Sequence, residues 1–257
     1  MRRIEMWSAF CGAAMLTLSA MAAAQVPESL SHGRFEQVPV LMPKGEPQRV
    51  VIWLAGAGNT LKRQAQAESL QADGAMVAVV DTAHLYAVLR KAGDTCTFSV
   101  GDVENFSRYM QAFHHIPTYR LPLLVGDGAG AALAYAIAAQ ATPHVLAGML
   151  TDGFCPANVS NQAICEPGVR PGTNTLLPLP LQIPWVLAAS QDKRCPAAAE
   201  ESFLKQVPQA RMFRRSARGD ILPGLRAAVR SLGEQKGVAL PPPPGGLADL
   251  PVVELPA

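Results

Sequence analysis

Short apolar runs rich in β-branched residues, separated by longer segments, most constrain the fold of this 257-residue chain. Runs without polar alternation are typical of strands buried on both faces of a parallel sheet. The segments between them are long enough for helices, and a β-α-β-α order implies right-handed crossovers. We therefore predict an α/β fold, a doubly wound, mostly parallel sheet with helices on both faces. The predicted core strands span residues 50–54, 76–80, 121–125, 145–150 and 185–189.

Polar residues that can cap helices mark the segments between these strands. Asn59 is predicted to cap a helix that runs toward Gly74, and Asp102 to cap a helix that runs to about His114. The other predicted elements are an alanine-rich helix over 128–141, a last helix over 222–232, an opening strand over 35–42 and a late edge strand over 210–215.

The N-terminal segment has the pattern of a secretory signal peptide. Arg2 and Arg3 precede an apolar run that ends in three alanines near residue 24. We therefore expect residues 1–24 to be cleaved and the mature protein to be periplasmic. No later stretch approaches the roughly 18 uninterrupted apolar residues of a membrane span, so no transmembrane segment is expected after signal removal.

The charge balance argues against nucleic-acid partners. The chain has 22 Lys and Arg against 20 Asp and Glu, a formal net charge of +2. Without the signal segment, which holds two Arg and one Glu, these numbers become 20 and 19, or +1. Nucleic-acid binders usually carry a strong excess of basic residues, so no nucleic-acid partner is expected.

Four cysteines remain in the predicted mature chain: Cys96, Cys155, Cys165 and Cys195. An even number in an exported chain indicates two disulfides. Three pairings are possible and the spacing does not choose among them, although Cys155 and Cys165 are close enough in sequence to close one loop. Because no CxxC zinc spacing occurs, no metal site is expected.

The strand-turn-helix segment over residues 121–135 is the most informative for function. Its turn, Gly126-Asp127-Gly128-Ala129-Gly130, has the shape of the G-x-S-x-G nucleophile elbow of α/β-hydrolases. In that elbow, small flanking residues permit a strained turn above a helix N-terminus. The central residue here is Gly128, which has no side chain that could act as a nucleophile.

Other parts of the hydrolase pattern are retained incompletely. Gly56, Ala57 and Gly58 follow the first core strand, where the backbone N–H groups of an oxyanion hole are expected. Asp192 follows a later strand, in the position of the triad acid, but no histidine follows it and Gly219 stands at the position of the base. We interpret Asp192 as a vestigial acid or as a loop residue that caps the next helix.

From about residue 50 to 215 the chain resembles the VirJ/AcvB family of periplasmic bacterial virulence proteins. The resemblance is carried by VIWLAGAG (51–58), DTCTFSVGDVENFSRYMQAFHHIPTYRLPLLVGDGAG (94–130), DGFCP (152–156) and ASQDKRCP (189–196). Members with an intact triad are α/β-hydrolases linked to hydrolysis of aminoacylated phosphatidylglycerol. The two-domain AcvB form carries a degenerate first domain before a catalytic second domain.

Gly128 and Gly219 make this chain similar to the degenerate domain. The resemblance therefore implies that residues 25–235 form a non-catalytic binding or scaffold domain that works with a catalytic relative. An active hydrolase of aminoacyl-phosphatidylglycerol esters is the alternative. The proline-rich residues 236–257 are interpreted as a linker or tail, and the likeness of LPVVELP (250–256) to VPVLMP (38–43) is either chance or the start of a second domain.

We expect a binding site where the glycine-rich turns meet an arginine-bearing loop. Open backbone N–H groups, a helix N-terminus and nearby arginines favour anions such as phospholipid headgroups. The arginines have a second explanation, because charged residues also protect solvated edge strands.

Asp127 has two interpretations: a displaced carboxylate nucleophile, or a solvent-facing turn or cap residue. The missing base favours the second. The predicted binding residues are Gly56, Ala57, Gly58, Gly126, Asp127, Gly128, Ala129, Arg214, Arg215 and Arg218.

The same turn also fits a dinucleotide fingerprint. Gly126, Gly128 and Gly130, followed by Ala131, match G-x-G-x-x-A, and Asp152 ends the next predicted strand. However, the turn follows the third predicted core strand instead of the first, and a nicotinamide cofactor is unexpected in an exported protein. No cofactor is therefore predicted.

Overall fold

The computed structural model describes residues 27–233 except 59, 95, 98, 157–163, 166, 171–172, 174, 192–194, 214 and 216–219. Several predictions lie outside the described residues. These concern the signal segment 1–24, the tail 236–257, the cap Asn59, the acid Asp192, the base position Gly219, and Arg214 and Arg218.

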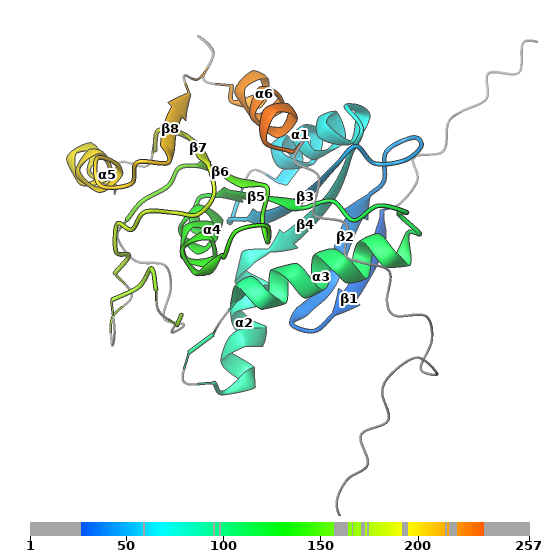
Figure 1. Ribbon diagram of the computed structural model, residues 1–257, viewed down its shortest axis with the longest axis horizontal. Helices are drawn as coiled ribbons and strands as arrows, with labels where there is room; N and C mark the ends of the chain where they lie inside the picture. The colour runs from blue at the N-terminus through cyan, green and yellow to red at the C-terminus, as the bar shows by residue number, and fades with distance from the viewer. Residues whose placement is uncertain are drawn as a thin grey trace, which may run out of the picture.

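An eight-stranded sheet forms the centre of the domain (Figure 1), in the order β1-β2-β4-β3-β5-β6-β7-β8. Neighbouring strands from β4 to β8 are parallel, whereas β1 and β2 are antiparallel additions at one edge. The predicted mostly parallel sheet is confirmed, and the late strand β8 lies at an edge as expected. The strands are β1 (Glu28–His32), β2 (Phe35–Leu41), β3 (Arg49–Ala55), β4 (Ala75–Asp81), β5 (Pro122–Asp127), β6 (Gly148–Asp152), β7 (Trp185–Ala188) and β8 (Ala210–Phe213).

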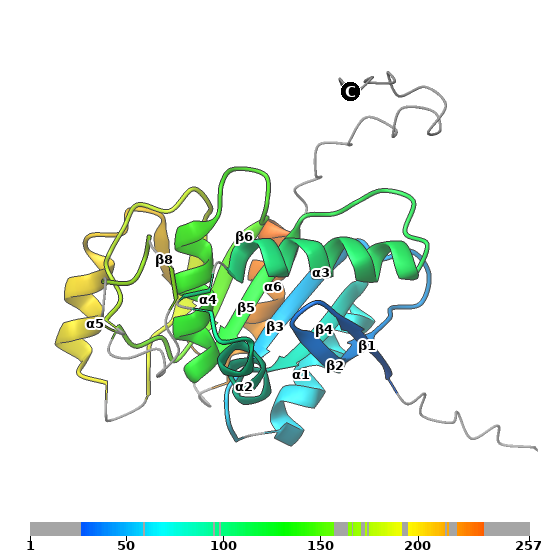
Figure 2. The ribbon, with the colours of Figure 1, turned by 90° about the horizontal axis from the view of Figure 1, so that it is seen from below.

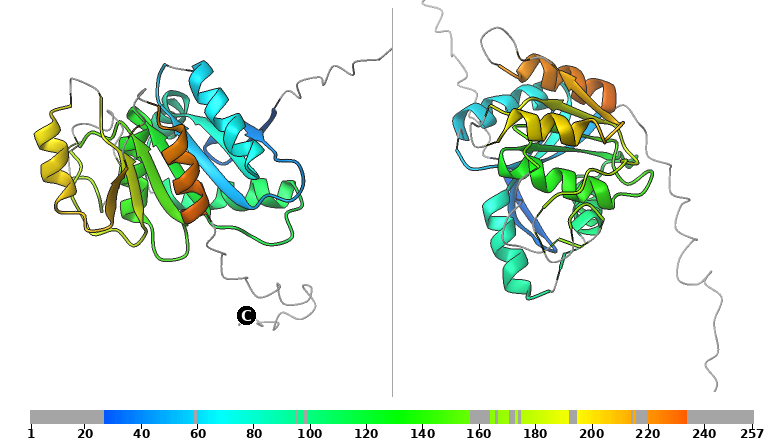
Figure 3. Two further views of the ribbon diagram at one scale, coloured as in Figure 1. Left: turned by 90° about the horizontal axis from the view of Figure 1, so that it is seen from above. Right: turned by 90° about the vertical axis from the view of Figure 1, so that its left-hand side faces the viewer.

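Helices cover both faces of the sheet (Figures 2 and 3). One apolar cluster joins the sheet to α2 (Thr82–Ala92), α3 (Ser99–Phe113), α4 (Ala129–Gln140) and α5 (Ala197–Leu204). The other cluster joins the opposite face to α1 (Thr60–Ala72) and α6 (Leu222–Leu232). Every residue of the central strand β3 is buried, which agrees with its uninterrupted apolar sequence. In the described part of the chain, no helix is both long and apolar enough to cross a membrane.

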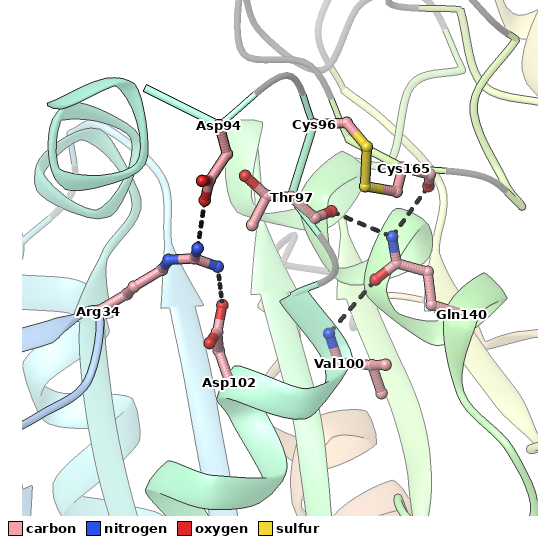
Figure 4. The surroundings of a disulfide bond; sticks show 8 residues. All are labelled: Arg34, Asp94, Cys96, Thr97, Val100, Asp102, Gln140 and Cys165. Atoms are coloured by element: carbon pink, nitrogen blue, oxygen red, sulfur yellow. Dashed lines mark hydrogen bonds and ion pairs between the residues drawn. A yellow bond between two sulfur atoms is a disulfide. The ribbon is translucent and has the colours of Figure 1, made fainter. Parts of the chain in front are cut away.

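The predicted start of α3 is wrong. Asp102 lies inside the first turn of the helix, which begins at Ser99, so it does not cap the helix. Its carboxylate instead accepts a 2.8 Å hydrogen bond from Arg34, and Arg34 also pairs with Asp94 (Figure 4). The Asp102 side chain therefore takes part in a long-range ion pair, whereas the local sequence predicted that it caps the helix.

Two disulfides join segments that are distant in sequence: Cys96–Cys165 and Cys155–Cys195. Two bonds were predicted, and the short Cys155–Cys165 loop is not formed. Beside the first bond (Figure 4), the Gln140 amide donates to the carbonyls of Cys165 at 2.9 Å and Thr97 at 3.3 Å. The segment before α3 and the segment after β6 are thus attached together at the end of α4.

We expect all four cysteines to be oxidised in this pairing when peptides of the purified protein are mapped by mass spectrometry without reduction. Replacing Cys96 and Cys165 together by serine should lower the free energy of unfolding by about 2–4 kcal/mol, because the disulfide restricts the unfolded chain. A peptide linking Cys155 to Cys165, or thiols that alkylate in the folded protein, would contradict the pairing.

Candidate functional site

A strained turn connects β5 to α4. Gly128 has φ +52° and ψ −119°, a conformation that is costly for any residue with a side chain. Its N–H donates to the carbonyl of Asp152 at 3.0 Å, which fixes the turn against the end of β6. A Cβ atom on Gly128 would meet no atom of the described residues within 4 Å. The turn therefore has room for the side chain that the sequence does not supply.

The flanking glycines are required by close packing of the backbone. A Cβ on Gly126 would lie 2.4 Å from the Gly130 carbonyl oxygen, and one on Gly130 would lie 2.0 Å from the Leu54 carbonyl oxygen. A Cβ on Gly56 would lie 2.5 Å from the Asp127 carbonyl oxygen. The spacing that also fits a dinucleotide fingerprint is thus explained by packing of the turn on β3 and α4.

Asp127 joins the turn to β3, to the loop after β3 and to α1. Its Oδ1 accepts from the Gly56 N–H at 2.7 Å, and its Oδ2 accepts from Trp53 Nε1 at 3.0 Å and Arg63 Nε at 2.8 Å. Arg63 also donates to the carbonyls of Gly56 at 2.6 Å and Gly58 at 2.8 Å. The ion pair is largely buried, with 11% of the Arg63 side chain and 20% of the Asp127 side chain exposed.

This network corrects the interpretation of Asp127 as a solvent-facing residue and bears on its interpretation as a nucleophile. The residue is not a solvent-facing turn or cap residue, because its side chain is mostly buried and bonds to distant segments. It is also poorly suited to be a nucleophile, since both carboxylate oxygens already accept hydrogen bonds. Sequence reasoning missed Arg63. The available signal was its position three and seven residues before Gln66 and Leu70, on the helix face that packs against the sheet.

A second ion pair closes the other side of the turn. Arg215 pairs with the carboxylate of Asp152 at the end of β6 and donates to the Ala189 carbonyl at 3.0 Å. Burial raises the pKa of Asp152, while the attraction of Arg215 opposes that rise. Arg215 is predicted to bind an external anion; its Nη2 already makes these two internal contacts, whereas its Nε is buried without a hydrogen-bond partner among the described residues.

A cleft of about 690 Å³ opens at the carboxyl ends of the central strands. It brings together six predicted binding residues: Ala57, Gly58, Asp127, Gly128, Ala129 and Arg215. Gly56 and Gly126 are buried in the packing of the turn and do not line the cleft. Lining residues that sequence reasoning did not propose include Lys62, Arg63, Gln66, Ser190 and Gln191. The described residues contain no group of three or more His, Cys, Asp and Glu side chains suited to a metal ion.

Several solved structures resemble this chain over most of their length. TT1662 from Thermus thermophilus has a TM-score of 0.52 at 15% identity, covering 83% of this chain and 100% of its own. A soluble variant of monoglyceride lipase from Saccharomyces cerevisiae has a TM-score of 0.51 at 10% identity, covering 84% and 98%. The fold is that of the α/β-hydrolases. DcsB, solved with its substrate analogue, has a TM-score of 0.53 at 9% identity, covering 77% of this chain and 94% of its own.

These identities establish the hydrolase fold alone. The sequence matches no protein-family model and no curated protein. The function of the cleft must therefore be argued from the residues that line it.

We expect Asp127→Asn to lower the free energy of unfolding by about 2–3 kcal/mol, because it leaves Arg63 largely buried without its counter-charge. The new amide nitrogen would also face donor groups of Trp53 or Arg63. Urea unfolding measures the change. The matched control is Glu104→Gln, which breaks the half-exposed pair between Glu104 and Arg108 on α3 and should cost about 0.5 kcal/mol or less. Equal losses in the two variants would show that Asp127 is only a surface residue.

Proposed function

We propose that this protein is a non-catalytic α/β-hydrolase-fold domain of the VirJ/AcvB type that acts by binding, with a catalytic relative as its partner. The observation that carries the proposal is the elbow itself. Gly128 has the strained backbone of the turn and open space above it, but no nucleophilic side chain.

The charged groups in the cleft do not replace the missing nucleophile and base. Asp127 is held by Arg63 and Asp152 by Arg215, so each carboxylate has an internal partner. Histidine is absent from the described residues that line the cleft. Loss of a triad serine or histidine costs on the order of 10⁶ in turnover in a serine protease. Acyl transfer therefore has little support here.

The cleft nevertheless has the dimensions of a ligand site. Its volume of about 690 Å³ lies within the range of small-molecule pockets, roughly 300–1,000 Å³. The proposed ligand is an anionic group such as a phospholipid headgroup. The two disulfides support an exported, periplasmic location, because such bonds persist in oxidising compartments.

We expect the purified mature protein to show no turnover above background on short acyl esters or aminoacyl-phosphatidylglycerol. A lipase that cleaves the same substrates serves as the positive control. Gly128→Ser should remain inactive, because the new serine would have no base to activate it. Turnover by the unmodified protein that a serine-directed inhibitor abolishes would favour the alternative, an active hydrolase.

A further inference from the structure

We infer that the elbow cleft is a binding site for a phosphate group, formed by the side chains of Gln66 and Lys62 on α1 and the N-terminus of α4. The inference rests on the proposed function and names the chemical class of its ligand. The bound group would occupy the space above Gly128, where a Cβ would meet no atom.

Gln66 supplies the observation that points to a ligand. The residue is only 6% exposed, and its Nε2 is a buried donor without a hydrogen-bond partner. Buried polar groups are normally paired, since an unpaired donor loses its bonds to water without compensation. Because Gln66 also lines the cleft, an acceptor on a ligand in the cleft would complete its hydrogen bonding.

The N-terminus of α4 offers backbone donors in the same cleft. This 12-residue helix begins at Ala129, and its N-cap Gly128 provides no side-chain hydrogen bond to the first turn. The first N–H groups of a helix have no partner within the helix, and the helix dipole favours an anion there. At α2, by contrast, the Asp81 carboxylate accepts from the N–H groups of Ala83 and His84.

Among the described residues that line the cleft, the positive charges outnumber the negative ones by one. Lys62, Arg63 and Arg215 are balanced against Asp127 and Asp152, which gives 3 − 2 = +1. Arg63 and Arg215 neutralise the two carboxylates at short range, so an incoming anion does not meet an unpaired negative charge. Lys62 is exposed and forms no ion pair with any described residue.

A phosphate group fits this set of donors. It presents several acceptor oxygens and no obligatory donor, and the cleft-lining residues Gln66, Ala129 and Lys62 carry an amide, a backbone N–H and an ammonium that can donate to them. These groups come from two different helices, so a tetrahedral anion can be held from both sides. The phosphate can belong to a free phosphate compound or to a phospholipid headgroup, because both present the same oxygens.

Calorimetric titration of the mature protein with inorganic phosphate tests the site. We expect binding in the unmodified protein, a loss of about tenfold in affinity for Gln66→Leu, and no detectable binding for Gln66→Glu, which replaces the donor with a negative charge. The matched control is Gln64→Leu, since Gln64 is an exposed residue of the same helix that pairs with Glu68. Its affinity should equal that of the unmodified protein.

Thermal unfolding without phosphate separates binding from a structural role. If Gln66 serves a ligand, Gln66→Leu should melt at the same or a higher temperature, because it removes an unpaired buried donor. A lower melting temperature with an unchanged affinity for phosphate would assign Gln66 to packing and overturn the inference.

Vesicle sedimentation then distinguishes the two sources of phosphate. The site is assigned to anionic lipid headgroups if the protein binds phosphatidylglycerol vesicles but not phosphatidylcholine vesicles, and if Gln66→Glu abolishes that binding. Binding of inorganic phosphate without vesicle binding would assign it to a free phosphate compound. If the unmodified protein binds neither probe, the inference and the anionic ligand fail, while a non-catalytic domain that binds a catalytic relative still stands. Esterase turnover would instead overturn the proposed function.

Discussion

The buried ion pair between Asp127 and Arg63 holds together the segments that build the cleft. Asp127 ends β5, Arg63 lies on α1, and both bind the loop at Gly56 that follows β3. A largely buried carboxylate is stable only when its charge and lone pairs are matched, so moving any one of these segments would leave a charge or a donor unpaired. The relative positions of the turn, the loop and α1 therefore depend on one another.

The same interaction limits the chemistry of the site. A carboxylate that accepts from Trp53, Gly56 and Arg63 has little freedom to attack a substrate. The neighbouring Asp152 is restrained in the same way by Arg215. The hydrolase scaffold thus retains its strained turn and its open helix N-terminus, while its charged side chains serve the architecture.

The sequence predicted the parts of the fold that depend on local pattern. Uninterrupted apolar runs identified the core strands, because strands buried on both faces need apolar residues throughout. The strand β1 escaped prediction, since Leu30 is the single buried residue among its five. The helix α2 was missed even though Asp81 is a capping residue that accepts from its first N–H groups.

The side chains of the site were harder to predict than the turn that carries them. The glycine spacing located the elbow because backbone packing there tolerates nothing larger. The roles of Asp127 and Arg63 depend on a contact between segments about 60 residues apart, which no local spacing reveals. Asp127 in particular has the local sequence of a turn residue and becomes buried only when α1 packs over the turn.

Amide hydrogen exchange measured by NMR on the purified protein tests the central claim most directly. The account predicts that the Gly56 amide, bonded to the Asp127 carboxylate, exchanges slowly. It predicts that the Ala129 amide exchanges rapidly without ligand and becomes protected when inorganic phosphate is added. Rapid exchange of the Gly56 amide would contradict the claim that Asp127 holds the cleft together. If added phosphate leaves the exchange rate of the Ala129 amide unchanged, the claim that the elbow is open to anions is contradicted.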